Sequence, residues 1–418
     1  MAFRKSGGLP CLSNGGNEIV AEFRRNGITN FPANTIPFCN SLEFEYFYIK
    51  HKKDSAVTKE EILRAVPKVL LHDHLDGGLR PATIIELANE MKYKKLPTQD
   101  PGELAEWFHR GANKGNLVEY LQGFEHTCAV MQTKEGLTRI AYEMMEDMYK
   151  DGVCYVETRF APVFHTSKGL YYDDVVTAVL EGLEKGKRDF GVGYGLIICG
   201  MRNMKNSLEM AELAVNYRGQ GVVGFDLAGE EGGYPPKKHV EAFQFIQRAN
   251  FNITIHAGEA FGKESIWQAI QWCGAHRIGH GTNILQDLTF SPEGEVVGMG
   301  DLAQYILDKR IPIEICLLSN VHTGAIDKLE NHPFGHLFKL KFRLTLNTDD
   351  RLMSNTTMTN ECMLARDYFN LSLDDIEKIQ INAMKSSFIP YNQRLEFIYK
   401  VIKPGYQAMR EKLLSLSM

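Results

Sequence analysis

Eight short apolar runs, separated by longer amphipathic stretches, are the feature of this 418-residue sequence that most limits its fold. The runs are rich in Val, Ile and Leu, and their apolar residues follow one another almost without alternation. Such runs are typical of parallel strands that helices cover on both faces. The runs are 68–74, 152–160, 192–199, 221–227, 252–256, 275–280, 311–316 and 343–349.

Helical patterns occupy the gaps between these runs. Helices are expected over 83–91 (after Pro81 at the helix start), 137–151, 172–188, 207–217, 237–250, 263–272, 300–309 and 359–369. Strands that alternate with helical crossovers predict an α/β protein, a (β/α)8 TIM-type barrel with extra helices. An open doubly wound sheet is the alternative, although no G-x-G-x-x-G motif follows the first run.

Three segments do not follow this alternation. Residues 92–130 are expected to add helices, either as a lid over a substrate or as extra core. Residues 286–300 indicate an exposed loop insertion, and residues 372–418 indicate helices packed on the outside of the barrel. All three are therefore treated as additions to one barrel domain that spans residues 67–418.

Residues 1–66 are interpreted as an N-terminal extension that packs on the barrel. The first 40 residues are rich in Gly, Asn and Pro, which indicates an irregular leader. Towards its end, residues 55–65 predict a short helix, with Thr58 as N-cap and Glu61 at the capping-box spacing.

Composition excludes several classes of partner and favours one compartment. The net charge is −5 and there is no long basic block, so neither nucleic acid nor a membrane surface is expected as a partner. Eight cysteines are scattered without CxxC pairs, which indicates reduced thiols and a cytoplasmic protein. The N-terminus lacks the apolar segment of a secretory signal. The sequence does not fix the oligomeric state.

Polar residues capable of chemistry stand where the apolar runs end. His72 and His74 end the first run, and side chains two apart in a strand point to the same face. His256 ends the fifth run and Asp349 ends the eighth. Active sites of such barrels lie at the carboxyl ends of the strands, so these four side chains are predicted to meet.

Three imidazoles and a carboxylate suit one divalent metal ion with a position left for water. Nitrogen-rich ligation favours zinc, one ion per chain, with other first-row metals possible. Such an ion lowers the pKa of its water toward about 7. His280, at the end of the sixth run, is positioned to orient that water and take its proton, and Glu259 to protonate a leaving group or ring nitrogen. Asp350 is expected to face the substrate.

Each of these residues has a structural alternative. His72 and His74 could be exposed histidines at a strand end, and His280 could be a core histidine with satisfied hydrogen bonds. Glu259 could be an acid at a helix start, where the helix dipole favours it. Asp350 could lie behind the metal ligands instead of facing the substrate.

Five ordered motifs together resemble the adenosine deaminase family of the metal-dependent amidohydrolase superfamily. They extend from about Pro67 to beyond Asp350, and they are His72-x-His74-Leu75-Asp76-Gly77, Asp226-Leu227-Ala228-Gly229-x-Glu231, His256-Ala257-Gly258-Glu259, Arg277-Ile278-Gly279-His280-Gly281 and Thr348-Asp349-Asp350. The resemblance implies zinc-dependent hydrolysis of adenosine and 2′-deoxyadenosine to inosine or 2′-deoxyinosine and ammonia. In the family pattern His72, His74, His256 and Asp349 match the zinc ligands.

The resemblance also implies roles in substrate binding and catalysis. Glu259 matches the acid that protonates purine N1, and His280 matches the residue that positions the attacking hydroxide. Asp350 matches the acceptor at N7, and Gly229 matches the backbone donor at N3. Asp76, together with His74, matches the contact to a ribose hydroxyl.

Asp76 also bears on which purine is the substrate. Adenine deaminases of the superfamily typically carry Glu here, and relatives acting on nucleotides carry Asn or another pattern. A carboxylate repels a 5′-phosphate, so Asp76 favours a nucleoside over AMP. Adenine, AMP and N6-methyl-AMP remain alternative substrates, and a non-catalytic nucleoside-binding protein is a remote one. Arg351 departs from the family, because many members have proline at this position.

Overall fold

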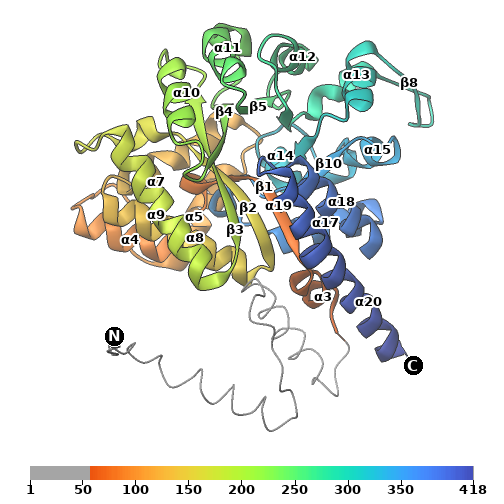
Figure 1. Ribbon diagram of the computed structural model, residues 1–418, viewed down its shortest axis with the longest axis horizontal. Helices are drawn as coiled ribbons and strands as arrows, with labels where there is room; N and C mark the ends of the chain where they lie inside the picture. Colours follow the sequence, from red (N-terminus) through yellow and green to blue (C-terminus); the bar gives the residue numbers. More distant parts are fainter. Residues whose placement is uncertain (1–56, 418) are drawn as a thin grey trace, which may run out of the picture. The chain divides into compact units, whose positions relative to one another are not determined.

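The computed structural model describes residues 57–417, so the expectations for the leader lie outside the described residues. Eight parallel strands form one sheet in the order β1-β2-β3-β4-β5-β6-β9-β10 (Figure 1). Their bounds are β1 Lys68–His74, β2 Val153–Phe160, β3 Gly193–Met201, β4 Val222–Ala228, β5 Asn252–Ala257, β6 Arg277–His280, β9 Ile313–Ile315 and β10 Leu344–Leu346. The strand order follows the chain order throughout, which confirms the predicted barrel.

The last strand meets the first at the carboxyl end of the barrel. Asp349 forms a parallel bridge with Asp73. The backbone N–H of His74 donates to the carbonyl of Asp349 at 3.1 Å, and the N–H of Asp349 donates to the carbonyl of His72 at 3.0 Å. These bonds join β10 to β1, so the open doubly wound sheet is excluded.

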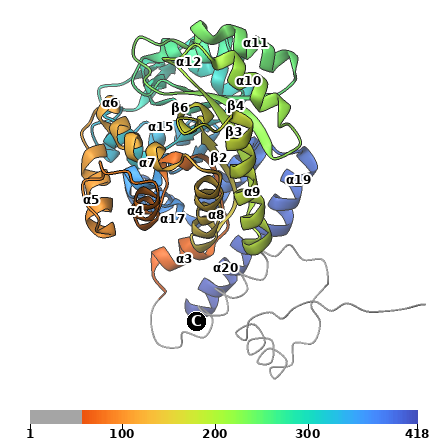
Figure 2. The same cartoon turned by 90° about the vertical axis from the view of Figure 1, so that its left-hand side faces the viewer.

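The helices surround the strands, as Figures 1 and 2 show from two directions. The crossover helices are α4 Pro81–Glu90, α8 Lys134–Lys150, α9 Tyr172–Phe190, α10 Ser207–Asn216, α11 Val240–Arg248, α12 Lys263–Gln271, α13 Asp301–Lys309, α14 Leu317–His322, α15 Phe334–Lys339 and α17 Met358–Phe369. Single helical turns are η3 Pro162–His165, η4 Pro236–His239, η5 Thr282–Asp287, η6 Leu329–Asn331 and α16 Arg351–Ser354. Most predicted helix bounds lie within a few residues of these.

Helices from both ends of the described chain lie against the barrel. The C-terminal segment forms α18 Leu373–Ser386, α19 Tyr391–Glu396, the π-helix η7 Phe397–Ile402 and α20 Lys403–Ser417. Of these, α18 packs against β1 and β10, as expected for helices on the outside of the barrel. The helix α3, Lys59–Ala65, has the predicted capping box of Thr58 and Glu61 and packs against α17.

The two other additions differ from each other in kind. Residues 92–130 form α5 Pro101–Ala112, α6 Leu117–Tyr120, η2 Leu121–Gly123 and α7 Phe124–Val130. Residues 286–300, which we expected to be a loop, contain an antiparallel hairpin of β7 Leu288–Phe290 and β8 Val296–Met299. The turn between these strands includes Gly294 with φ +81°, a conformation that glycine adopts without strain.

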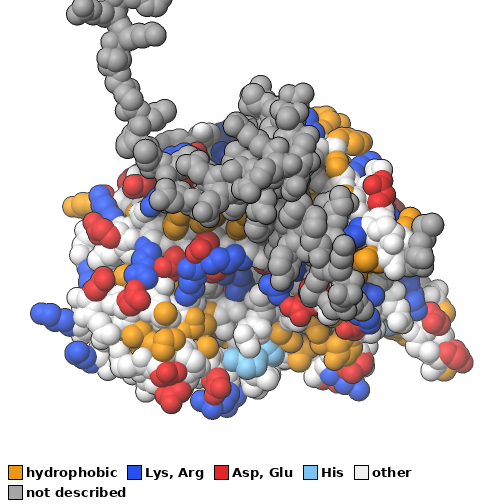
Figure 3. Space-filling view, turned by 90° about the horizontal axis from the view of Figure 1, so that it is seen from below, with side chains coloured by type: hydrophobic (Ala, Val, Ile, Leu, Met, Phe, Trp, Pro, Cys, Tyr) orange, Lys and Arg blue, Asp and Glu red, His pale blue; other side chains and the backbone are white. Residues whose placement is uncertain are grey.

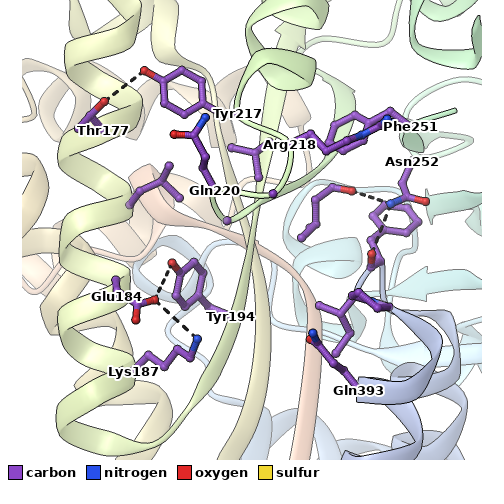
Figure 4. A pocket seen from close by; sticks show the side chains of 18 of the residues that line it. Thr177, Glu184, Lys187, Tyr194, Tyr217, Arg218, Gln220, Phe251, Asn252 and Gln393 are labelled. Atoms are coloured by element: carbon purple, nitrogen blue, oxygen red, sulfur yellow. Dashed lines mark hydrogen bonds and ion pairs between the residues drawn. The ribbon is translucent and has the colours of Figure 1, made fainter. Parts of the chain in front are cut away.

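A cavity of about 960 Å³ lies near the amino-terminal ends of β3, β4 and β5 (Figure 4). Its polar lining is largely paired: the Tyr194 hydroxyl donates to Glu184 at 3.1 Å, and the Asn252 side chain donates to the Val223 carbonyl at 2.7 Å. The predicted site residues lie at the other ends of the strands, so none of them lines this cavity.

The described surface carries mixed charge. On the face shown in Figure 3, acidic and basic side chains lie next to one another. Interspersed charges of both signs are typical of a solvated surface. Among residues 57–417, no helix is both long enough and apolar enough to cross a membrane.

Candidate active site

Strands on different sides of the barrel bring the four predicted ligands together. His72 Nε2 lies 3.1 Å from Asp349 Oδ1, and His74 Nε2 lies 3.5 Å from the same oxygen. His74 Nε2 and His256 Nε2 are 3.1 Å apart. All four side chains are buried or nearly so, and Asp349 adopts φ +58°, a strained backbone for a residue other than glycine.

Buried carboxylates hold two of these imidazoles in one orientation. His72 Nδ1 donates to Glu314 Oε2 at 2.9 Å, and His256 Nδ1 donates to Asp226 Oδ2 at 2.9 Å. Positive neighbours, Arg159 among them, keep the pKa of both carboxyl groups well below the usual range although burial opposes this. In the neutral form of each ring the proton is therefore on Nδ1, and Nε2 presents a lone pair to the centre of the cluster. Hydrogen bonds to Asp349 and Glu314 raise the pKa of His72, although burial and the charge of Arg159 oppose this.

This donor set fits a cation. Burial holds the pKa of His74 well below its usual value and also lowers that of His256, so both rings are neutral and can act as ligands. His72 Nε2 is buried and has no hydrogen-bond partner among the described residues. Lone pairs and a carboxylate oxygen that face one another at about 3 Å repel unless a positive ion lies between them.

His280 lies close enough to His72, His256 and Asp349 to share a metal ion with them, but a chain of hydrogen bonds distinguishes it from the four predicted ligands. Phe334 N–H donates to His332 Nδ1 at 3.1 Å, so the proton of neutral His332 is on Nε2, which pairs with Asn320 Oδ1 at 3.2 Å. The Asn320 amide then donates to His280 Nδ1 at 2.9 Å. Burial keeps the pKa of His280 well below its usual value, so the ring is neutral and carries its proton on Nε2.

Glu259 faces His280 from a loop held by a second carboxylate. Glu231 accepts four backbone N–H groups from residues 258–261, at 2.7 to 3.0 Å. Glu259 Oε2 lies 3.7 Å from His280 Nε2, and Oε1 is buried without a hydrogen-bond partner in the described chain. Burial, followed by the charges of Asp349 and Glu231, raises the pKa of Glu259 well above its usual value. Burial therefore favours the protonated form of this carboxyl group.

Asp350 is a second buried acid. Burial and the charges of Asp349 and Asp76 raise its pKa well above the usual range, and Asp350 Oδ1 has no hydrogen-bond partner among residues 57–417. The backbone of Gly77 approaches this carboxyl group so closely that a Cβ atom there would overlap it.

A cavity of about 240 Å³ opens beside the cluster. Three of the four residues that we expected to bind substrate, His74, Asp76 and Gly229, form part of its wall, whereas Asp350 is not among the lining residues. Gly229 has φ +96°, and a Cβ atom there would also lie 2.9 Å from the Met201 side chain. Apolar side chains form much of the remaining wall, and they come from the added helices, from η3 and from β3: Val118, Leu121, Phe124, Phe164 and Met201.

Several residues that support the site were missed in the sequence. Arg159 donates to Asp226 at 3.0 Å and to Glu314 at 2.9 Å, all three fully buried. Arg277 extends this network to Glu157 and Glu314, each at 2.5 Å. The sequence did carry one signal for these residues, namely a charged residue in the middle of an apolar run. A charge buried in such a run requires a partner of opposite charge.

Arg351 replaces the proline of many family members with a structural contact. Its Nε donates to Asp73 Oδ1 at 2.6 Å, and Thr158 and Thr348 donate to the same carboxylate at 3.3 and 3.2 Å. Arg351 therefore ties the turn after β10 to β1, close to the bridge that closes the barrel.

The fold and the histidine–aspartate cluster together define an amidohydrolase-type deaminase. Solved structures that share the fold include adenine deaminase from Arthrobacter aurescens, which is 26% identical with a TM-score of 0.73 and covers 81% of this chain and 98% of its own. Another is ADAL from Arabidopsis complexed with GMP, 27% identical with a TM-score of 0.70, covering 82% of this chain and 98% of its own.

Sequence comparison gives the family. Adenosine deaminase 1 of Streptomyces coelicolor is 51% identical over 357 residues, which are 84% of this chain and 90% of that protein. Adenosine deaminase of Mycobacteroides abscessus is 49% identical over 348 residues, 82% of this chain and 96% of its own. The family model for adenosine deaminase matches residues 67–404. The chain belongs to the adenosine deaminase family and is a hydrolase.

Proposed function

We propose that this chain binds one Zn²⁺ through His72, His74, His256 and Asp349 and deaminates adenosine and 2′-deoxyadenosine. The observation that carries the proposal is the convergence of these four side chains beside the buried carboxyl group of Glu259, whose pKa is raised by burial. Three imidazoles and a carboxylate suit zinc better than magnesium or calcium, which prefer oxygen ligands. When bound, zinc supplies a Lewis acid that makes water nucleophilic near neutral pH.

The hydrogen-bond pattern supports His74 over His280 as the third imidazole ligand. His280 Nδ1 accepts a hydrogen bond from the Asn320 amide, so in the neutral ring Nε2 carries the hydrogen and has no lone pair for a metal. His280 instead directs Nε2–H into the site and orients the attacking water by donating to it. This arrangement supports the orienting role of His280 more directly than it supports proton acceptance.

Two acids carry the purine chemistry in this proposal. Glu259, whose pKa burial raises well above its usual value, donates a proton to N1, which makes C6 more electrophilic. Asp350 faces N7 of the purine. The backbone N–H of Gly229 donates to N3, and the absence of a side chain there lets the ring approach.

Asp76 supports a nucleoside as the substrate. Its buried carboxylate lines the 240 Å³ cavity with His74, where it accepts a hydrogen bond from a ribose hydroxyl. A 5′-phosphate at this position would meet a like charge in a buried site. Nucleotides and adenine remain the alternatives, because ADAL binds GMP and the Arthrobacter protein is an adenine deaminase.

The test is a substrate panel on zinc-reconstituted protein. Ammonia release is measured with adenosine, 2′-deoxyadenosine, adenine, AMP and N6-methyl-AMP. We expect kcat/KM for the two nucleosides to exceed that for the others by about 10² or more. Faster turnover of adenine or a nucleotide would contradict the substrate assignment, and full activity in metal-free protein would contradict the zinc assignment.

The cytoplasm is the proposed compartment. The six cysteines in the described chain are free thiols, five of them buried, as is usual for proteins of reducing compartments.

A further inference from the structure

A second group of ligand-type side chains lies next to the proposed substrate cavity. Asp76, Cys128 and His165 each offer one atom, and these atoms lie within 4.8 Å of one another. They come from three separate elements, namely η1 Leu75–Gly77, α7 and η3. Their proximity is therefore a product of the tertiary fold.

Polar atoms in this group lack partners. His165 is 0% exposed, and neither of its ring nitrogens has a hydrogen-bond partner among the described residues. Asp76 Oδ1 is likewise buried and unpaired in that part of the chain. The nearest approach between the two side chains, 3.7 Å from His165 Nε2 to Asp76 Oδ2, is too long for a hydrogen bond. Buried imidazole and carboxylate groups without partners are costly, which indicates that a ligand satisfies them.

The site is held together by a buried glutamine. The Gln132 amide donates to the carbonyls of Cys128 and Phe164, both at 2.7 Å. Its carbonyl accepts the backbone N–H of Ser167 at 2.9 Å and the Ser167 hydroxyl at 2.7 Å. Gln132 thus fixes the end of α7 against η3, and these segments carry Cys128 and His165.

We propose that Asp76, Cys128 and His165 form a second metal site, specific for a thiophilic divalent cation such as Zn²⁺ or Cd²⁺. One sulfur, one nitrogen and one oxygen donor are a set that zinc-group metals accept, whereas magnesium and calcium do not bind thiolates well. Ligand atoms around tetrahedral zinc lie roughly 3.5 Å apart, so the three side chains need only small adjustments. On binding, the Cys128 thiol releases its proton to solvent.

Occupancy of this site inhibits the enzyme, a consequence that rests on the proposed function. Asp76 is the carboxylate that we assign to the ribose hydroxyl, and a cation bound to it competes with that contact. Excess zinc or cadmium therefore weakens nucleoside binding without displacing the ion at the His72 cluster.

Cadmium distinguishes the two sites, because only the second contains a thiolate. Zinc-loaded full-length protein is titrated with Cd²⁺, and binding is followed by thiolate-to-cadmium charge-transfer absorption and by equilibrium dialysis. We expect charge-transfer absorption and a second ion per chain in the wild type. Both are lost in Cys128→Ala and in His165→Leu, and both are retained in the matched control Cys273→Ala, which removes a buried thiol elsewhere.

If Cys128→Ala does not fold, Cys128→Ser replaces it in the experiment, because serine is close to cysteine in size. This variant is also expected to lose the charge-transfer absorption. Absent absorption in the wild type, or absorption that persists without Cys128, would overturn the second site. Adenosine turnover is measured in the same titration, and cadmium should raise KM in the wild type but not in Cys128→Ala. If no variant turns over adenosine, the proposed function fails while the absorption still decides the second site.

Discussion

His280 and Glu259 face each other across 3.7 Å, and burial favours the neutral form of both side chains. Burial lowers the pKa of the histidine well below its usual value and raises that of the glutamate well above it. A neutral imidazole and a protonated carboxyl group at the same pH are the arrangement that general acid catalysis requires. At the scale of single residues, Glu259 is therefore the proposed proton donor.

Replacing that proton donor tests its role. We expect Glu259→Gln to retain bound metal and to lower kcat for adenosine by about 10² to 10⁴, because the amide cannot protonate N1. Metal content and kcat are measured together, with the exposed Glu264→Gln as the matched control. A rate close to that of the control would assign the proton to another group.

Asn320 controls which nitrogen of His280 carries the proton. Asn320→Asp replaces the donor at His280 Nδ1 with an acceptor, so the neutral ring should move its proton from Nε2 to Nδ1. We expect kcat to fall about 10- to 100-fold with metal retained. Nitrogen NMR of labelled histidines reports the tautomer directly, and an unchanged tautomer would show that Asn320 does not set it.

The candidate residues could be predicted because barrel strands present their carboxyl ends to one site. His72, His256 and Asp349 each end an apolar run, and that position alone brought them together. Glu314 and Arg159 could not be paired in the same way, since a run of apolar residues predicts burial but not which buried charges meet. Only the three-dimensional structure shows that Arg159 pairs with Glu314 and that Glu314 in turn orients His72.

Among the secondary-structure elements, β1 and the turn after β10 are joined by a buried ion pair. Arg351 donates to Asp73, a carboxylate that is 0% exposed. Arg351→Ala leaves this charge without its cation, and we expect it to lower the free energy of unfolding by about 3–5 kcal/mol. Urea unfolding measures the loss, and Arg110→Ala, which removes an exposed pair with Glu106, should cost under about 1 kcal/mol. Equal losses in the two variants would contradict this account.

The turn η1 presses its backbone against Asp350. A Cβ atom at Gly77 overlaps the Asp350 carboxyl group, whereas one at Gly232 meets nothing within 4 Å. We therefore expect Gly77→Ala to displace Asp350 and reduce kcat/KM for adenosine by about 10²-fold with the metal retained. Gly232→Ala is the control and should be close to wild type. Similar kinetics in both variants would mean that Asp350 adjusts without loss.

Element bounds were predicted best where burial alone decides them. The strand β1 matches its predicted run, Lys68–His74, whereas β10 ends at Leu346, three residues before the predicted end at Asp349. The reason is that the partner strand β9 ends at Ile315, opposite Leu346, and beyond that point Asp349 pairs with Asp73 of β1 instead. The hairpin of β7 and β8 was not foreseen, since each strand is too short to show an alternating pattern.

At the scale of the whole molecule, the buried side chain of Glu361 makes the folding stability depend on pH. Glu361 accepts the Leu317 N–H at 3.0 Å and the Thr356 hydroxyl at 2.8 Å, and burial raises its pKa from 4.5 to about 8. Because the folded state binds this proton more tightly than the unfolded state, the contribution is complete below pH 4.5. It is lost as the pH rises through about 8.

Glu361→Gln mimics the protonated acid and removes this dependence. We expect the unfolding free energy of the wild type, measured in urea from pH 5 to 9, to decline more steeply than that of the variant. Between the unfolded-state and folded-state pKa values of Glu361, the unfolding free energy of the wild type should fall by about 1.4 kcal/mol more than that of the variant for each pH unit. Parallel curves would show that Glu361 does not titrate in this range.

The architecture as a whole could be predicted from the eight runs, because no other common fold needs so many covered parallel strands in chain order. The buried ion pairs of Arg159 and Arg277 could not be predicted, and neither could the group of Asp76, Cys128 and His165. Both depend on side chains that are distant in sequence and meet only when the barrel closes.

The bond between the two ends of the sheet has a consequence for synthesis. Asp349 joins β10 to β1 and is also one of the proposed ligands, so a nascent chain that stops before it holds only three of the four donors. Such a chain cannot seal the ring either. Binding of the proposed ion through all four donors must therefore wait until the last strand, β10, and Asp349 have left the ribosome, and truncated products should emerge without the ion.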